Sequence, residues 1–238
     1  MSTRIRLRSV TKSYTRGGIP LTVLEDLSLD AEPESFVALM GPSGSGKSTL
    51  LNLLGALDQP DSGSILVGDV EISSLAASAL PAWRARNVGF VFQSFNLISV
   101  LTAFENVLLP LKLTPLSRAD QKAHAAFALE VVGLQDRMHH RPSQLSGGQE
   151  QRVAIARAIS TDPALVLADE PTGDLDRRTA DEIMELLRRL NTELHKTIFM
   201  VTHDTRAAEQ AKTVLHLDKG RLDRTTPNDG DAEKRKPT

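Results

Sequence analysis

The sequence contains no cysteine, so a disulfide framework and a thiolate metal site are both excluded. This absence is compatible with a reducing cytosol. Long apolar runs are also missing: no stretch approaches the roughly 18 to 20 residues that a membrane-spanning helix needs, and the N-terminal residues lack the apolar core of a signal peptide. If a membrane is involved, we therefore expect another chain to span it.

An excess of charge of one sign is missing as well. The 28 basic and 30 acidic side chains leave a formal net charge of -2. No global field therefore points to nucleic acid or to anionic lipid, and we expect no nucleic-acid partner. With 238 residues, of which 40% are hydrophobic, the chain can bury a sizeable core as one large domain or as a domain with a subdomain.

Apolar residues first recur with the period of a half-exposed strand. Ile5 and Leu7 alternate with arginines, although Ser9 and Val10 break the alternation, and a second apolar run at 21–29 follows a turn-prone stretch. We therefore expect antiparallel structure at the N-terminus. Short apolar runs separated by helical stretches then predict the buried strands of a parallel α/β sheet, at residues 36–40, 88–92, 165–168, 198–201 and 214–217.

Three further stretches complete the predicted outline. Leucine and isoleucine recur at helical spacing from about residue 179 to 194, which predicts a helix covering one face of the sheet. Residues 102–133 have helical patterns and no convincing strand, so we expect a helical subdomain there. From residue 223 to residue 238, polar and charged residues without apolar periodicity predict a disordered tail.

A glycine-rich loop directly follows the first predicted buried strand. It fits the phosphate-binding pattern G-x-x-x-x-G-K-[ST] and precedes an apolar helix at 49–57, which is the context that the motif requires. Backbone N–H groups of such a loop surround a phosphate, while Lys47 reaches the β- and γ-phosphates and the Ser48 hydroxyl ligates Mg²⁺. A flexible Gly/Ser loop is the alternative. The predicted nucleotide-binding residues are Gly41, Pro42, Ser43, Gly44, Ser45, Gly46, Lys47, Ser48 and Thr49.

Two adjacent carboxylates follow the predicted strand at 165–168. Asp169 and Glu170 should lie at the carboxyl edge of the sheet, near the phosphate loop. Asp169 can then hold the Mg²⁺ shell, and Glu170 can orient or deprotonate the attacking water. A surface turn explains such a pair when it stands alone. Together with Lys47, the pair predicts a site that hydrolyses ATP.

A second glycine-rich stretch precedes a helix that begins near residue 150. It consists of Ser146, Gly147, Gly148 and Gln149. Ser146 with Gln149 has the pattern of a helix capping box, which is a sufficient structural explanation. The same geometry also makes an anion site, because a serine and bare glycine amides stand at a helix N-terminus. Since it would be odd for one protomer to supply this site and the phosphate loop to the same γ-phosphate, a second subunit is the natural complement.

The order and spacing of these motifs, together with His203, resemble the nucleotide-binding subunits of the ATP-binding-cassette (ABC) family. The resemblance implies an α/β P-loop NTPase core with an N-terminal antiparallel β subdomain and a helical subdomain at about 94–160, all within a nucleotide-binding domain over residues 1–222. It also implies ATP and Mg²⁺ as cofactors. The expected assembly is a head-to-tail homodimer that encloses nucleotide between its subunits.

The resemblance implies four further site residues. Gln93, after the strand at 88–92, looks like the glutamine that senses Mg²⁺ and the lytic water, and His203 looks like the histidine that contacts the γ-phosphate. Asp174 lies in a stretch that resembles the loop crossing the dimer interface. Tyr14, the only tyrosine, resembles the aromatic residue that stacks on adenine, and a surface hairpin aromatic is its alternative.

Three classes of function remain: an ATPase coupled to membrane subunits, a non-transport ABC ATPase, and another P-loop enzyme such as a kinase. The second glycine-rich stretch argues against a kinase, and a single cassette without a long heptad arm argues against ribosome- and DNA-acting relatives. Residues 88–110 resemble the branch of lipoprotein-release, macrolide-efflux and cell-division ATPases; a small-solute importer is the alternative. We expect an integral membrane permease as partner, a peripheral location on the cytoplasmic face of the inner membrane, and permease docking on residues 95–109, whose alternative is subdomain core.

Overall fold

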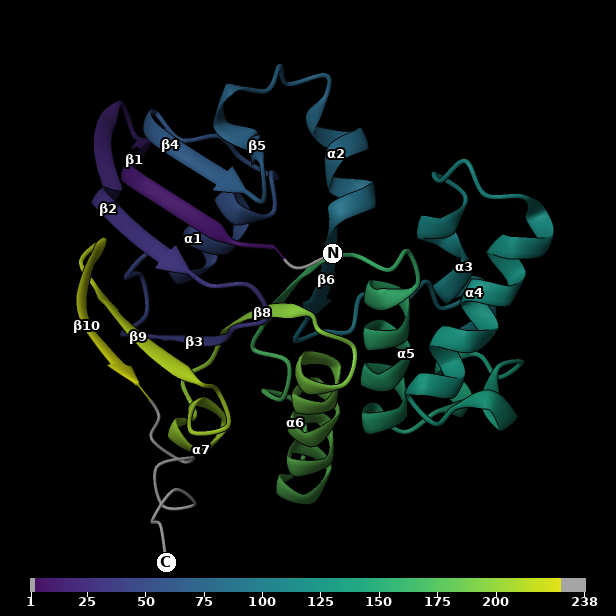
Figure 1. Cartoon of the computed structure of the whole chain (residues 1–238). Helices are drawn as coiled ribbons and strands as arrows, with labels where there is room; N and C mark the ends of the chain where they lie inside the picture. Colours follow the sequence, from purple (N-terminus) through teal and green to yellow (C-terminus); the bar gives the residue numbers. More distant parts are fainter. Residues whose placement is uncertain (1–2, 228–238) are drawn as a thin grey trace, which may run out of the picture.

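Two β-sheets with helices around the larger one organise the chain (Figure 1). The computed structural model describes residues 3–227. The smaller sheet is antiparallel with the strand order β2-β1-β4-β5, and the larger sheet has the order β10-β9-β3-β8-β7-β6. The strands are β1 (Ile5–Arg16), β2 (Ile19–Ala31), β3 (Phe36–Met40), β4 (Ser62–Val67), β5 (Val70–Glu71), β6 (Val88–Phe92), β7 (Leu165–Asp169), β8 (Thr197–Val201), β9 (Thr213–Asp218) and β10 (Arg221–Pro227).

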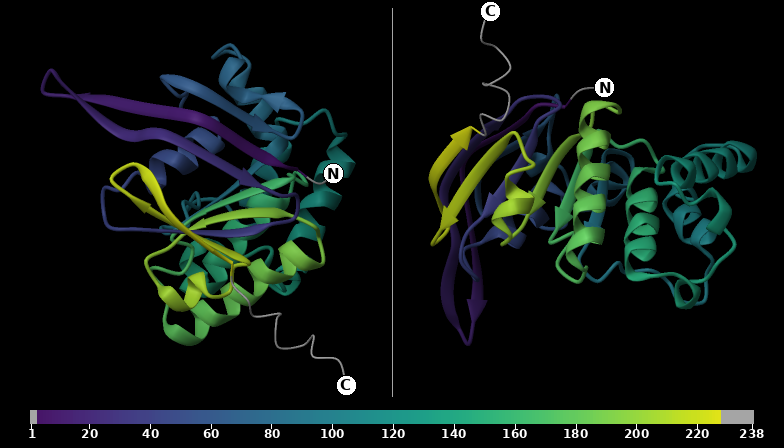
Figure 2. Two further views of the ribbon diagram at one scale, coloured as in Figure 1. Left: turned by 60° about the vertical axis from the view of Figure 1, so that its left-hand side comes forward. Right: turned by 90° about the horizontal axis from the view of Figure 1, so that it is seen from below.

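Seven α-helices and three short 3₁₀ turns connect these strands in the described residues. The helices are α1 (Lys47–Leu54), α2 (Leu80–Asn87), α3 (Ala103–Leu111), α4 (Arg118–Val131), α5 (Gly147–Ile159), α6 (Arg177–Thr192) and α7 (Thr205–Ala208); the 3₁₀ turns are Ile72–Ser74, Gln135–Arg137 and Pro142–Gln144. Helices α3, α4 and α5 stand together at one side of the larger sheet, and α6 lies between this group and α7 (Figures 1 and 2). The predicted helical subdomain, at about 94–160, thus contains α3, α4, α5 and two 3₁₀ turns and no strand. Among residues 3–227, every helix is too short or too polar to cross a bilayer.

All five predicted buried strands are present in the larger sheet. Strands β9, β3, β8, β7 and β6 pair in parallel, whereas β10 returns antiparallel to β9. The sheet is thus mixed, because the short connection between β9 and β10 allows only an antiparallel pair. Residues 223–227 belong to β10, so the prediction of a tail from residue 223 was wrong for these residues. The predicted tail at 228–238 lies outside the described residues.

Both faces of the larger sheet are buried, which explains the continuous apolar runs of its strands. Neighbouring residues of a strand point to opposite faces: Val37 and Leu39 pack toward α1 and the smaller sheet, and Ala38 packs toward α3–α6. The two resulting apolar clusters hold the larger sheet from either side. This packing fixes the carboxyl ends of β3, β7 and β8 at one edge, where the predicted site residues follow.

The smaller sheet confirms the predicted antiparallel N-terminus. Strand β1 pairs with both β2 and β4, and its register shifts between Leu7 and Val10. Ser9, inside this interval, has a φ of 47°, which is in the left-handed region. The break in the alternation at Ser9 and Val10 is therefore a β-bulge, and it strengthens the local twist of β1.

Candidate active site

The predicted phosphate loop connects the end of β3 to the start of α1. At Gly41, whose φ is 151°, a Cβ would lie 2.0 Å from the carbonyl oxygen of Leu217, so no side chain fits there. Gly46 is the N-cap of α1 in the left-handed conformation, and no side chain of the described residues caps this helix end. The first N–H groups of α1 thus lack a side-chain acceptor. Such an end is a ready site for phosphate.

Lys47 folds back over this loop. Its Nζ donates hydrogen bonds to the carbonyl oxygens of Gly41 (2.8 Å) and Pro42 (2.9 Å). Because its partners are neutral, the ammonium keeps its full charge for phosphate oxygens. Ser45 faces the protein interior: it is buried, and its backbone carbonyl accepts from the N–H of Gly220 (3.1 Å).

A cavity of about 550 Å³ opens beside the loop. Its walls join parts that are distant in the sequence: the loop, the turn after β7 and the turn after β8. The predicted site residues in its lining are Tyr14, Gly41, Ser43, Gly44, Gly46, Lys47, Ser48, Thr49, Glu170 and His203. Among the described residues, the predicted site residues outside this lining are Pro42, Ser45, Gln93, Ser146, Gly147, Gly148, Gln149, Asp169 and Asp174.

The two predicted Mg²⁺ ligands Ser48 and Asp169 lie near each other. Burial raises the pKa of Asp169 above its ordinary value; the Ser48 hydroxyl, which by itself lowers this pKa, opposes the rise, and the neighbouring Glu170 carboxylate adds to it. A hydroxyl and a carboxylate are oxygen ligands that suit Mg²⁺, which is usually held by few protein groups with phosphate oxygens and water. The pair fits Mg²⁺, although no group of three or more His, Cys, Asp or Glu side chains among residues 3–227 is placed to hold a metal.

Glu170 and His203 meet because β7 and β8 are neighbours. Asp169 is opposite Val201 in the parallel register, and the backbone N–H of Glu170 donates to the Val201 carbonyl (3.0 Å). The Nδ1 of His203 lies 3.0 Å from Oε2 of Glu170. Glu170 has a φ of 48°, a strained conformation for a residue with a Cβ, and such strain is concentrated at functional sites. The turn thus holds a carboxylate beside an imidazole at the mouth of the cavity.

Gln93 and Asp174 contact each other. The Nε2 of Gln93 donates to Oδ1 of Asp174 at 2.6 Å. The structure thus places the predicted Mg²⁺-sensing glutamine beside the stretch that resembles a dimer-interface loop. The roles predicted for both residues stay proposals.

The second glycine-rich stretch forms the N-terminus of α5. Ser146 is the N-cap; its Oγ accepts from the N–H of Gln149 (3.4 Å), and the Gln149 side chain accepts from the N–H of Ser146 (3.0 Å). The predicted capping box is therefore present. The capping bonds do not use the N–H groups of Gly147 and Gly148, and these residues have no side chains of their own to cover them. The same helix end therefore keeps its capacity to bind an anion.

Tyr14 lines the cavity from the hairpin of β1 and β2, and its side chain is half exposed. Its hydroxyl donates to Oδ2 of Asp58 (2.8 Å), and the Lys12 ammonium lies 5.1 Å from the ring centroid. Lys12 itself is buried and donates to Oδ1 of Asp58 (2.8 Å). Lys12 and Asp58 hold the ring in place, and sequence reasoning missed both, because they are 46 positions apart and match no motif.

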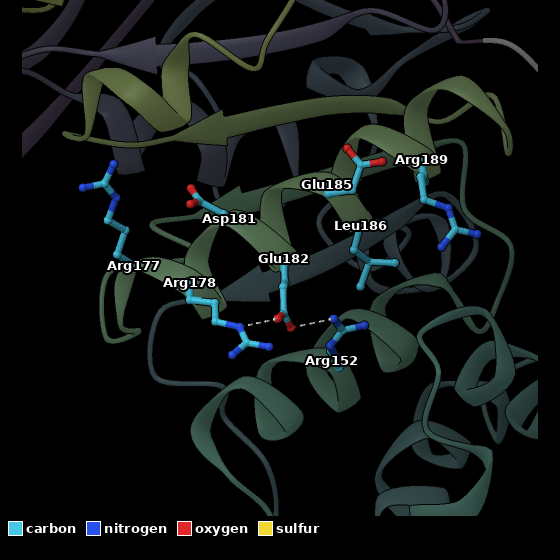
Figure 3. Close-up of a pocket in the computed structure, with 8 residues that line it drawn as sticks. All are labelled: Arg152, Arg177, Arg178, Asp181, Glu182, Glu185, Leu186 and Arg189. Atoms are coloured by element: carbon cyan, nitrogen blue, oxygen red, sulfur yellow. Dashed lines mark hydrogen bonds and ion pairs between the residues drawn. The ribbon is translucent and has the colours of Figure 1, made fainter.

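A second cavity, of about 640 Å³, lies between α5 and α6 (Figure 3). Its wall carries four arginines and three carboxylates, and Glu182 forms ion pairs with Arg152 (3.2 Å) and with Arg178 (3.5 Å). Figure 3 shows Glu182 between these two arginines. No predicted catalytic or nucleotide-binding residue belongs to the lining, so the larger size of this cavity does not make it the active site.

Comparison with known proteins decides the family. The family described as "ABC transporter" matches residues 24–173, which include the phosphate loop, the second glycine-rich stretch, Asp169 and Glu170. The chain belongs to the ABC transporter family. It is therefore an ATPase that uses ATP and Mg²⁺. Its second glycine-rich stretch, at 146–149, lies within the matched residues and is the candidate ABC signature.

Individual ABC relatives resemble nearly the whole chain. The "Lipoprotein-releasing system ATP-binding protein LolD" of Pseudomonas fluorescens is 48% identical, with 90% of this chain and 95% of that protein aligned. The "Macrolide export ATP-binding/permease protein MacB 1/2" of Paracoccus denitrificans is 49% identical over 92% of this chain, which spans 32% of that protein. A solved dimer of "the ATP-binding cassette MJ0796 bound to ADP and Pi" has a TM-score of 0.85 and 41% identity, covering 94% of this chain and 98% of that one.

Proposed function

We propose that this chain is the ATPase subunit of an envelope transporter: two copies close head to tail around two ATP–Mg²⁺ and drive a separate integral membrane permease. One observation is the main support for the proposed dimer. The phosphate loop, Glu170 and His203 share one cavity, whereas the signature at Ser146 stands outside it, within the described part of the chain. The solved relative whose cassette is described as dimeric supports the same arrangement.

Each site residue has a proposed task within this dimer. Lys47 and the amides of the phosphate loop bind the β- and γ-phosphates, and Ser48 with Asp169 holds Mg²⁺, which, when bound, neutralises charge on the phosphate oxygens. Tyr14 stacks on adenine. The signature of the partner protomer contacts the γ-phosphate from the opposite side.

Hydrolysis is proposed to use Glu170 as the general base. Its carboxylate orients the attacking water and accepts a proton from it. His203, which faces Glu170 through Nδ1 at 3.0 Å, keeps its other ring nitrogen for the γ-phosphate. When its hydrogen bond to Asp174 breaks, the Gln93 side chain can turn toward Mg²⁺ and the attacking water. Asp174 is then available to contact the partner protomer.

The membrane partner is proposed from the relatives and from the surface. The proteins named LolD and MacB point to lipoprotein release or export, or to mechanical work across the envelope. An amino-acid-type importer is the alternative. The location that follows is peripheral, on the cytoplasmic face of the inner membrane. Isolation of the membrane protein that co-purifies with this chain distinguishes these cases, because the substrate is determined by the permease.

The segment at 95–109 divides into a buried and an exposed part. Ala103 and Val107 are fully buried in the helical lobe, whereas Ile98 and Val100 are 45% and 70% exposed in the loop before α3. We propose that this loop docks the permease, since exposed apolar side chains mark interaction sites. Val100→Asp should therefore uncouple transport and leave the ATPase activity of the isolated chain unchanged. Equal loss of both activities would indicate misfolding and would count against docking.

Mixing two defective chains tests whether the active site is shared. Homodimers of Lys47→Ala lack the phosphate cation in both sites, and homodimers of Ser146→Arg block both signatures. In the heterodimer, one site combines the intact loop of one chain with the intact signature of the other. We expect mixing to restore ATPase activity.

The control is an independent measurement that heterodimers form. If the loop and the signature served the same protomer, every site would keep one lesion and mixing would restore nothing. A dimer that needs two working sites for turnover would still occlude one ATP–Mg²⁺, so bound nucleotide is counted as well. No turnover and no occluded nucleotide would contradict the shared site.

A further inference from the structure

Gln151 lies between the segments that carry the proposed hydrolytic residues. Its side chain is fully buried within α5. Its Nε2 donates to the carbonyl oxygen of Pro171 (2.5 Å) and to that of Phe92 (3.3 Å). Pro171 directly follows Glu170, and Phe92 directly precedes Gln93. One amide thus joins the signature helix to the backbone beside both residues.

The orientation of this amide is determined by its surroundings. Two carbonyl acceptors face Nε2, so exchange of the amide nitrogen and oxygen would set Oε1 against two oxygens. In the present orientation Oε1 is buried and has no hydrogen-bond partner among residues 3–227. A buried acceptor without a donor is unfavourable, and an apolar side chain of the same length would avoid this cost. The amide is therefore better explained by the geometry that it imposes than by stability.

Helix α5 is fixed against the neighbouring strand further along its length. Arg157 donates to the carbonyl oxygens of Phe95 (2.8 Å) and Asn96 (2.5 Å), and a Cβ at Gly89 would lie only 2.2 Å from the carbonyl oxygen of Ala158. The helix, β6 and the turn after Gln93 are therefore in close contact.

We propose that Gln151 is a positioning residue for ATP hydrolysis, which aligns the backbone beside Glu170 and Gln93 with the signature helix when the partner's nucleotide engages that helix. This inference rests on the proposed role of Glu170. Gln151 is fully buried and does not line the cavity at the phosphate loop. Its loss should therefore lower kcat and leave the affinity for ATP, which depends on Lys47 and the phosphate loop, unchanged.

Gln151→Met and Asn191→Leu form a matched pair for the test. Asn191 is also a buried amide in a helix, and its Nδ2 likewise bridges two backbone carbonyls, those of Glu34 (2.8 Å) and Lys196 (2.7 Å), remote from the site segments. Each substitution removes such a bridge and replaces it with an apolar side chain. Steady-state ATPase activity, ATP affinity and the thermal midpoint are measured for both variants and for the parent.

Gln151→Met is expected to lower kcat by about 10-fold or more with the Kd for ATP–Mg²⁺ within about twofold of the parent, the range expected when positioning of a general base is disturbed. Asn191→Leu is expected to keep kcat within about twofold. The proposal is refuted if Gln151→Met keeps the parent's kcat, or if both variants lose kcat equally. Glu170→Gln is assayed alongside: rapid turnover by that variant would reject the proposed role of Glu170 itself, whatever Gln151→Met does.

If Gln151→Met does not fold, Gln151→Glu replaces it. The protonated carboxyl group can donate to one of the two carbonyls, whereas the ionised group donates to neither, and burial raises its pKa. The ratio of variant to parent kcat is expected to rise at least about threefold from about pH 8 to about pH 6. A ratio that is flat over this range would refute the proposal.

Discussion

Two glycine-rich helix N-termini of this chain are built in opposite ways. At α1 the N-cap is Gly46 in the left-handed conformation, without a capping side chain among the described residues. At α5 the N-cap is Ser146, and a complete capping box with Gln149 satisfies the helix end. The first end lines the cavity that also contains Glu170 and His203; the second does not.

The difference indicates an order of events. The first N–H groups of α1 lack a capping side chain, and Lys47 stands beside them, so in the proposed function one chain binds ATP through this end. The end of α5 is stabilised without a ligand because its capping box satisfies the N–H groups of Ser146 and Gln149, while those of Gly147 and Gly148 stay available for an anion. It can therefore remain exposed on an isolated chain and contact a phosphate when a second chain supplies one.

Lys47→Ala should have the largest effect, because it removes the cation at the α1 end. The loop amides alone must then hold the phosphate charge, and we expect productive ATP binding to be lost, with an affinity at least about 100-fold weaker. Direct binding of ATP–Mg²⁺ by calorimetry measures this. Lys122→Ala, an exposed lysine on α4, is the matched control. A Lys47→Ala chain that binds as tightly as the parent would contradict the proposed phosphate site.

Glu170→Gln should separate binding from hydrolysis. We expect near-normal ATP affinity with turnover lower by about two to four orders of magnitude, the scale of losing a general base. ATP-bound dimers should accumulate, which size-exclusion chromatography detects. Rapid hydrolysis by this variant would move the base role elsewhere, for example to His203.

Ser146→Ala tests whether the α5 end does more than cap its helix. Loss of a serine N-cap costs about 1 kcal/mol of stability. Ser117→Ala is the matched control, because Ser117 caps α4 by accepting from the N–H of Asp120 in the same way. We expect similar thermal midpoints for both variants, but a loss of ATPase activity, of about 10-fold, only for Ser146→Ala. Equal ATPase activities of the two variants would indicate that Ser146 does no more than cap its helix.

Asp169→Asn should have a small effect on the stability of the nucleotide-free chain, opposite in sign to the loss of a helix cap. Burial raises the pKa of Asp169, so the folded state disfavours the carboxylate, and stability decreases as pH rises through the unfolded and then the folded pKa. At neutral pH the neutral amide should therefore raise the thermal midpoint without nucleotide, on the order of 2 °C. Mg²⁺ with ATP should stabilise the parent more than the variant. A lower midpoint for the variant at neutral pH would contradict the cause assigned to the pKa shift.

The sequence predicted those parts whose patterns are local. The strands β3, β7 and β8 were predictable because both of their faces are buried and the runs at 36–40, 165–168 and 198–201 consist of apolar residues. Their carboxyl ends then placed Lys47, Asp169 and Glu170 together. Strand β4 was missed because it begins Ser-Gly-Ser, and β10 was missed because its polar sequence is a strand only through pairing with β9.

Contacts between distant segments were beyond prediction. Lys12 and Asp58 carry no signal in the sequence, and their bond exists because β1 and the stretch after α1 happen to meet. Gln151 carries no such signal either, since nothing in the local sequence indicates that its amide is buried between two other segments. The pair Gln93 and Asp174, 81 positions apart, is of the same kind.

That pair has a thermodynamic consequence. A nucleotide that draws Gln93 toward its phosphates must break the bond to Asp174, and a second chain that engages Asp174 must break the same bond. Whichever event comes first removes the cost for the other. Linked equilibria are reciprocal. In the proposed function, the factor by which nucleotide favours association of the two chains therefore equals the factor by which association favours the movement of Gln93 toward nucleotide.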